Sequence, residues 1–172
     1  MTVQPDLFAE PHELEDPRDC WMTKAYVYDP IHSEFRFKWD LAASEENTKC
    51  PRFISIDEDA LLQDWTKLEG PCWINPPFSR LDEFVEKASR TILLEDAPVI
   101  VIIMPITRNE QPWFHRWVVG RAAELRVIQT RVDYEPVEGI PESGPGFGSQ
   151  LVIFRPGHKG PTVLGSHLVD KP

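Results

Sequence analysis

Cysteine is scarce in this sequence of 172 residues. The three cysteines, Cys20, Cys50 and Cys72, are odd in number and far apart, which fits neither a disulfide framework nor a paired zinc site. The five histidines are also scattered, and no two of them stand three or four residues apart. We therefore expect reduced, buried cysteines and no metal site.

Long hydrophobic runs are absent as well. No stretch approaches the roughly 20 apolar residues that cross a bilayer, and residues 1–10 lack the basic and apolar regions of a signal peptide. With 41% hydrophobic and 27% charged residues, the composition is typical of a soluble globular domain. We expect a cytoplasmic protein that does not contact the membrane.

Basic residues are few: 18 Lys and Arg against 28 Asp and Glu give a formal net charge of −10. A protein that binds nucleic-acid phosphates usually has a positive net charge. The acidity is regional, however. Residues 6–19 hold six acids and one arginine, whereas residues 108–131 hold five arginines and two glutamates. A basic face therefore remains available, and the acidic surface offers a site for a host protein partner.

The chain divides into three segments by composition. Residues 1–19 combine acids with three prolines, which predicts an acidic, flexible N-terminal arm. Residues 157–172 contain three glycines and predict a flexible tail. A single domain is expected between them, over residues 20–156.

Hydrophobic periodicity predicts an α/β domain over residues 20–156. Helical spacing is found over residues 81–94 and 111–123, with one or two helical turns over 59–65. Strand patterns occur over residues 35–39, 52–56, 72–74, 98–105, 125–130 and 150–154. The continuously apolar segment 98–105 is typical of a buried parallel strand. No helix separates the last two strands, so we expect a mainly parallel sheet that ends in an antiparallel hairpin.

Asn75-Pro76-Pro77-Phe78 directly follows the short apolar strand 72–74. An adenine amino nitrogen is a poor nucleophile because its lone pair is delocalised into the ring. If Asn75 Oδ1 and the Pro76 carbonyl accept its two N–H bonds, they stabilise the positive charge that develops during alkylation. The prolines restrict the loop, and Phe78 offers a ring on which a base turned out of the duplex can stack. The alternative is a plain proline turn, but a polar group at a strand's carboxyl end is where an α/β sheet places its site.

Several motifs then occur in a fixed order along the chain. They are Trp21-Met22-Thr23, residues 39–44 with Asn47 and Cys50, Asp59-Ala60-Leu61 with Trp65, Trp73 to Ser79, Arg131 with Tyr134, and residues 148–154. Together they resemble the phage-type DNA N6-adenine methyltransferases, the Dam-like family of phages and prophages. The resemblance covers about residues 20–155. Lys24 stands where the family often has Pro, Phe78 where Tyr is commoner, and no Gly-x-Gly cofactor loop is present.

The resemblance implies a Rossmann-like class I fold and S-adenosyl-L-methionine as the cofactor. It implies methylation of a flipped adenine at N6 in double-stranded DNA, in the cytoplasm of a bacterial host. The catalytic residues would be Asn75, Pro76, Pro77 and Phe78. The cofactor would be bound by Trp21, Thr23, Asp40, Ala42 and Asp59. DNA would be contacted by Phe78, Ser79, Arg108 and Arg131.

Each of these residues also has a purely structural interpretation. Asp40 and Asp59 could cap the segments that follow them, Trp21 could belong to the core, and Arg108 could lie on a solvated helix face. Two other functions also stay open: methylation of another nitrogen, in an RNA base or a protein glutamine, and a non-enzymatic acidic protein that mimics DNA or binds a host factor.

Overall fold

The computed structural model describes residue 19 and residues 21–135 and 146–171; the predicted arm, apart from Asp19, lies outside them. The strands are β1 (Met22–Thr23), β2 (Trp39–Asp40), β3 (Arg52–Phe53), β4 (Cys72–Ile74), β5 (Ile100–Pro105), β6 (Glu124–Ile128), β7 (Tyr134–Glu135), β8 (Ser149–Phe154) and β9 (Val163–His167). The helices are α1 (Ala25–Phe35), α2 (Leu81–Thr91) and α3 (Pro112–Trp117), with short 3-10 turns η2 (Trp65–Lys67), η3 (Phe78–Arg80) and η4 (Ile106–Arg108).

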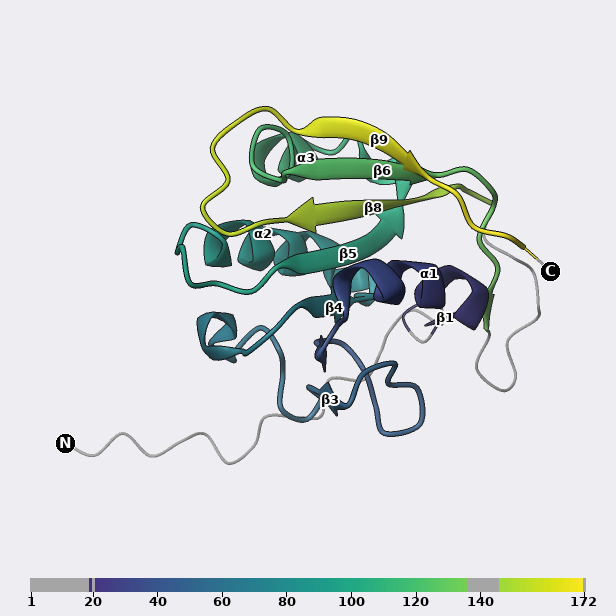
Figure 1. The fold of residues 1–172 in the computed structure, drawn as a ribbon, viewed down its shortest axis with the longest axis horizontal. Coiled ribbons are helices and arrows are strands. Elements are labelled where there is room, and N and C mark those ends of the chain that lie inside the picture. Colours follow the sequence, from purple (N-terminus) through teal and green to yellow (C-terminus); the bar gives the residue numbers. More distant parts are fainter. Residues whose placement is uncertain (1–18, 20, 136–145, 172) are drawn as a thin grey trace.

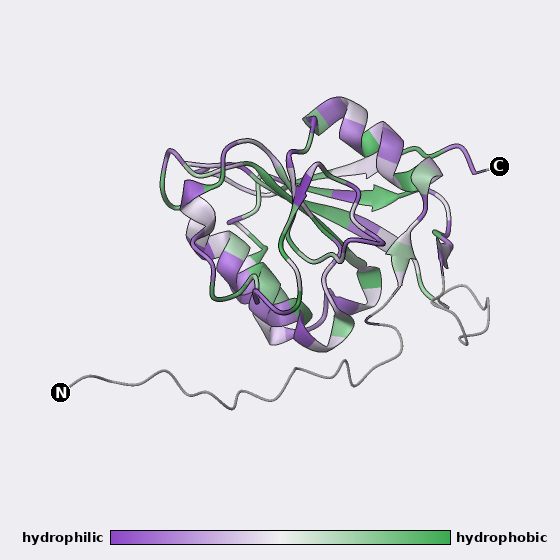
Figure 2. Ribbon diagram, turned by 90° about the horizontal axis from the view of Figure 1, so that it is seen from below, coloured by the Kyte–Doolittle hydropathy of each residue, from purple (hydrophilic) through white to green (hydrophobic). Residues whose placement is uncertain are grey.

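The molecule has three layers. A seven-stranded sheet in the order β3-β2-β4-β5-β8-β6-β9 separates α1, in front of it in Figure 1, from α2 and α3 behind it. The front layer buries Val27, Ile31 and Phe35 of α1 against one face of the sheet, and the back layer buries α2 and α3 against the other. Figure 2 shows the hydrophobic central strands between helices that carry hydrophilic residues on their outer sides.

The sequence predicted the centre of the fold correctly. Every residue of β4 and β5 is buried, and the two strands pair in parallel. Between them, α2 buries Leu81, Phe84 and Ala88 at the spacing of one helix face. Gly70, with a positive φ of 96°, makes the turn into β4, where a Cβ would lie 2.5 Å from Lys38 Cγ.

The predicted antiparallel pairing of β6 and β8 is also confirmed. The sheet does not end there, however, because β8 lies between β5 and β6 and is antiparallel to both. Residues 163–167, which the sequence placed in a flexible tail, form β9 and pair in parallel with β6 at the edge. The prediction missed this strand because the three glycines of residues 157–172 outweighed its short apolar run.

Two helices differ from the sequence-based expectation. The segment before β2 forms α1, with Pro30 inside it and Arg36 as its left-handed cap, so Phe35 ends a helix instead of starting a strand. The alternation over residues 35–39 therefore reflects packing of Phe35 and Phe37, whose rings stack 5.6 Å apart. The helix expected over residues 111–123 ends at Trp117, and Gly120 has a positive φ of 73° just beyond it.

Candidate active site at the carboxyl edge of the sheet

The carboxyl ends of β2, β3 and β4 lie at one edge of the sheet because these strands run in parallel. The chain passes from β2 outward to β3 and then crosses to β4 on the other side of β2. Such a reversal of strand order opens a crevice outside the strand ends, where α/β proteins bind ligands. Asp40 ends β2 and Asn75 follows β4, so the two predicted site residues flank this point.

A cavity of about 960 Å³ opens at this edge. Its walls are the segments that follow the three strands, residues 41–47, 53–60 and 75–84, together with Asp19. A second, small cavity of about 30 Å³ is lined by Trp21, Thr23 and Asp40. Ala42 and Asn75 line both cavities, so the structure brings the predicted catalytic and cofactor residues together.

The large cavity is strongly acidic. Among the described residues, its lining includes Asp19, Glu45, Glu46, Asp57, Glu58, Asp59 and Glu83, with Arg80 as the one basic side chain. A concave surface with one sign of charge concentrates ligands of the opposite sign. This cavity therefore favours a cationic ligand and disfavours a phosphate, and part of the net negative charge of the chain is accounted for here.

The side chain of Asn75 is held by the segment that precedes β1. Asn75 Nδ2 donates a hydrogen bond of 2.6 Å to the backbone carbonyl of Trp21. The reverse orientation of the amide would set two oxygens against each other at that distance. Because the nitrogen is committed to Trp21, the acceptor Oδ1 is the end that remains for a ligand.

The same segment holds the other end of the loop. The Asp19 carboxylate accepts hydrogen bonds from the backbone N–H of Ser79 at 3.0 Å and from its hydroxyl at 2.6 Å. The chain around Asp19 and Trp21 thus contacts both ends of the predicted catalytic loop, and Pro76 between them is buried. Sequence reasoning did not identify Asp19 as a site residue, because an acid in a Pro-rich arm carries no signal of this contact.

Asp40 is buried, with 3% of its surface exposed, and accepts backbone hydrogen bonds from Ala42 at 3.4 Å and Lys49 at 3.2 Å. Burial raises the pKa of its carboxyl to about 6, and the two backbone donors oppose this shift only in part. In the same small cavity, the hydroxyl of Thr23 is buried and has no hydrogen-bond partner among the described residues. An unsatisfied buried hydroxyl of this kind indicates a site for a polar ligand group.

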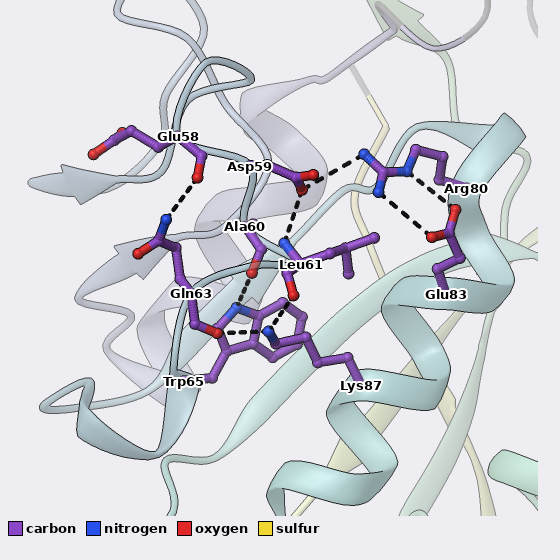
Figure 3. Close-up of polar contacts among 9 residues, drawn as sticks. All are labelled: Glu58, Asp59, Ala60, Leu61, Gln63, Trp65, Arg80, Glu83 and Lys87. Carbon is purple, nitrogen blue, oxygen red and sulfur yellow. Dashed lines mark hydrogen bonds and ion pairs between the residues drawn. The ribbon is translucent and has the colours of Figure 1, made fainter. Parts of the chain in front are cut away.

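Asp59 lines the large cavity and has a positive φ of 43°, which is uncommon for a non-glycine residue. Its carboxylate accepts a hydrogen bond from Leu61 N at 3.0 Å and lies 3.5 Å from the Arg80 guanidinium (Figure 3). Asp59 thus caps a local turn, which is the structural role that the sequence allowed for it. It also lines the cavity.

Two basic residues that were not predicted as site residues, Arg80 and Lys87, connect the segment around Asp59 to α2. The guanidinium of Arg80 pairs with Asp59 and with Glu83, which raises its pKa. Lys87 Nζ donates to the carbonyls of Leu61 and Gln63 and lies 5.1 Å from the Trp65 ring centroid (Figure 3). Arg80 is the second residue after the Asn75–Phe78 loop, so the loop and the segment that carries Asp59 are both supported by Arg80.

Phe78 is only 8% exposed, so its ring does not present an open face. The ring lies edge-to-face with Trp21, at 6.0 Å between centroids, and against Phe147 at 5.8 Å. Trp21 in turn stacks on Tyr134 at 5.7 Å. These four side chains form an aromatic row beside Asn75 that begins in β7 and ends just before β8.

The predicted DNA-contacting residues lie at the same edge. Arg108 ends η4, directly after β5, and Arg131 follows β6, a strand parallel to β5. Arg108 is partly buried, whereas Arg131 and Ser79 are exposed. Two further arginines of the segment 108–131, Arg116 and Arg121, pack over the Trp117 ring at 4.7 and 5.2 Å.

Cys50 and Cys72 are free and buried, and burial raises the pKa of the Cys72 thiol to about 12. Across the described residues, no group of three or more His, Cys, Asp and Glu side chains is arranged to hold a metal ion. Within the same ranges, none of the helices has the length and apolar character needed to cross a membrane.

The sheet order, with one antiparallel strand between β5 and β6, and an Asn-Pro-Pro-Phe loop at the switch point define a Rossmann-like α/β methyltransferase. The sequence profile of the family described as DNA N-6-adenine-methyltransferase (Dam) matches residues 10–171. The chain belongs to this family.

Individual relatives agree with the family. A DNA N-6-adenine-methyltransferase of Haemophilus phage HP1 is 29% identical over 143 residues, which cover 81% of this chain and 80% of the relative. The enzyme of the same name from Escherichia phage T1 is 36% identical over 151 residues, 87% of this chain but 59% of the relative. The putative methyltransferase YfdM of Escherichia coli K12 is 32% identical over 72 residues, 39% of this chain and 79% of its own length.

Proposed function

We propose that this chain transfers the methyl group of S-adenosyl-L-methionine to the N6 amino nitrogen of an adenine in double-stranded DNA, with Asn75 and Pro76 as the groups that bind that nitrogen. The observation that carries the proposal is the hydrogen bond of 2.6 Å from Asn75 Nδ2 to the Trp21 carbonyl. It leaves an amide oxygen as acceptor beside an acidic cavity at the switch point of the sheet.

The cavity residues fit the cofactor in size and charge. A volume of about 960 Å³ lies at the upper end of the usual range for cofactor sites, and the acidic lining suits a ligand with a sulfonium and an ammonium group. Thr23 and Asp40 would hold polar groups in the small cavity, and Asp59 would accept a hydrogen bond from the adenine amino group of the cofactor. Bound there, S-adenosyl-L-methionine supplies an electrophilic methyl group.

The residues of the loop prepare the acceptor nitrogen. Asn75 Oδ1 and the Pro76 carbonyl accept its two N–H bonds, which draws the nitrogen toward tetrahedral geometry and stabilises its developing positive charge. Holding the nitrogen in line with the methyl group lowers the entropic part of the barrier. No general base of tuned pKa is required, because the proton leaves N6 to water after transfer.

DNA approaches from the β5, β6 and β8 side of the edge. Arg108 and Arg131 lie there, whereas the β2 and β3 side carries the acidic cavity. Repulsion between that cavity and phosphates directs the duplex toward the arginines. A base turned out of the duplex then enters beside Asn75 and stacks within the aromatic row.

The test is a transfer assay with labelled S-adenosyl-L-methionine and three separate acceptors: unmethylated DNA, RNA and a protein extract. We expect label in DNA, and digestion to nucleosides followed by mass spectrometry should identify N6-methyladenine. Label in RNA or protein alone would assign the other acceptors. A chain that neither binds the cofactor by calorimetry nor transfers methyl would be a non-enzymatic acidic protein.

A further inference from the structure

The burial of Phe78 raises a problem for base binding. The residue is only 8% exposed, yet a flipped adenine held by Asn75 must lie against its ring. Within the described parts of the chain, two rings cover Phe78, those of Trp21 and Phe147, with centroids at 6.0 and 5.8 Å. One of them has to move before a base can enter.

Trp21 is fixed in place on several sides. Its carbonyl holds Asn75, and its ring stacks on Tyr134 at an interplanar angle of 21°. Tyr134 is itself 6% exposed, and its hydroxyl lies 3.1 Å from the hydroxyl of buried Ser149. Swinging the Trp21 ring would therefore break its stack on the buried Tyr134 ring, and shifting its backbone would release the amide of Asn75.

Phe147 has the freedom that Trp21 lacks. It is partly exposed and stands between two glycines. Gly148 is anchored, since its carbonyl accepts a hydrogen bond of 3.0 Å from Ile106 N and a Cβ there would meet Ile106 Cδ1 at 3.1 Å. Among the residues that the structure describes, a Cβ at Gly146 would meet no atom within 4 Å. The backbone is thus held on one side of Phe147 and open on the other.

We propose that Phe147 is a substrate-positioning residue: its ring covers Phe78 in the free enzyme, swings aside when the target base enters, and then packs against that base. Two stacking distances of about 3.5 Å are needed to hold a base between two rings, or roughly 7 Å in total. The present separation of 5.8 Å at an interplanar angle of 57° is too small, so entry requires a shift of Phe147. This inference rests on the proposed function.

The proposal is tested by comparing Phe147→Leu, Phe147→Tyr and Phe147→Ala in steady-state methylation of DNA. Stacking of one base on one ring predicts that Phe147→Leu and Phe147→Ala lower kcat/KM for DNA by about 5- to 100-fold. Phe147→Tyr should keep the wild-type value within about threefold, because the ring is retained. The dissociation constant of S-adenosyl-L-methionine should not change in any of the three.

Ile106→Ala is the matched control, since it alters the packing of the same segment without removing a ring. It should leave kcat/KM for DNA unchanged. The proposal is overturned if Phe147→Leu, shown to be folded by its circular dichroism and Tm, methylates DNA at the wild-type kcat/KM. It is also overturned if Phe147→Tyr is as impaired as Phe147→Leu. An inactive wild-type enzyme in the same assay would instead refute the proposed function.

Discussion

At the scale of single residues, a contact with Trp21 determines which end of the Asn75 amide can bind a ligand. Its nitrogen is taken by the Trp21 carbonyl, so its oxygen serves as acceptor. An aspartate at this position would place a carboxylate oxygen against that carbonyl. The choice of Asn over Asp therefore follows from a residue that is 54 positions away in the sequence.

Asp40 predicts a pH dependence of cofactor binding. Its pKa of about 6 means that the carboxyl is ionised at neutral pH and becomes neutral below that value. If the carboxylate binds the cofactor, affinity measured by calorimetry should fall as the pH is lowered from 7.5 to 5, by up to tenfold for each unit below 6. Asp40→Asn should bind weakly with little dependence on pH. Equal pH profiles in the two proteins would contradict the assignment.

The same residue has the opposite effect on stability. The folded protein binds the Asp40 proton more tightly than the unfolded chain does, with a pKa of about 6 against 3.8. Folding is therefore favoured at low pH, and this contribution is lost as the pH rises through about 6. Relative to Asp40→Asn, the wild-type free energy of unfolding should be larger at pH 4.5 than at pH 7.5, by about 2 kcal/mol at 1.4 kcal/mol per pKa unit. Urea unfolding at both pH values measures the difference.

At the scale of elements, the sequence correctly predicted the helices and strands that depend on the local residue pattern. The apolar run of β5 and the amphipathic face of α2 were correct because each depends on near neighbours. The helix α1 was missed because Pro30 breaks the local pattern, whereas burial of Val27 and Ile31 against the sheet overrides it. The same distinction holds for the site. Asn75 was predicted from the strand before it and the prolines after it, whereas the roles of Asp19 and Phe147 depend on contacts between segments that are distant in sequence.

An ion-pair network joins α1 to β6 and to the residue that follows β8. The Arg126 guanidinium donates to Glu34 on α1 at 2.7 and 2.8 Å and to Glu124 at 2.6 Å, and Arg155 donates to Glu124 at 2.8 Å. The hydrogen bonds from Arg126 lower the pKa of Glu34. Burial raises the pKa of Glu124, but its two arginine partners outweigh that effect.

Arg126→Met should therefore destabilise the fold by about 1–3 kcal/mol at pH 7.5, because Arg126 is only 16% exposed and its loss leaves two carboxylates side by side. Both carboxyl pKa values are lowered in the folded state. Their stabilisation is present above about 4.5, the unfolded value, and is lost as the pH falls further, so the difference should shrink in acid. Urea unfolding checks this. Lys67→Met, which breaks the exposed pair with Asp64, should leave the free energy of unfolding nearly unchanged.

At the scale of the whole molecule, charge is divided between two sides of one sheet edge. The acidic wall surrounds the cavity on the β2 and β3 side, while Arg108 and Arg131 follow β5 and β6. This division reconciles a net charge of −10 with a nucleic-acid substrate. It also means that only a few phosphates are neutralised, so duplex affinity should be modest.

The salt dependence of duplex binding measures how many phosphates the protein neutralises. Each phosphate contact contributes a slope of about −0.9 to the plot of log affinity against log salt. We expect a total slope of about −2 to −3 for duplex binding, and Arg131→Ala should reduce it by about 1. Lys159→Ala is the control, because Lys159 follows β8 at the opposite edge of the sheet. An unchanged slope in Arg131→Ala would remove Arg131 from the DNA interface.

The most direct test of the central claim is the single-turnover rate of N6-methyladenine formation by Asn75→Ala, with the cofactor saturating and its affinity measured alongside. We predict at least a hundredfold loss of rate, the usual effect of removing one group that stabilises developing charge, with cofactor affinity within about threefold of the wild type. Methylation of adenine at the wild-type rate by Asn75→Ala would contradict the claim that this amide binds the reacting nitrogen.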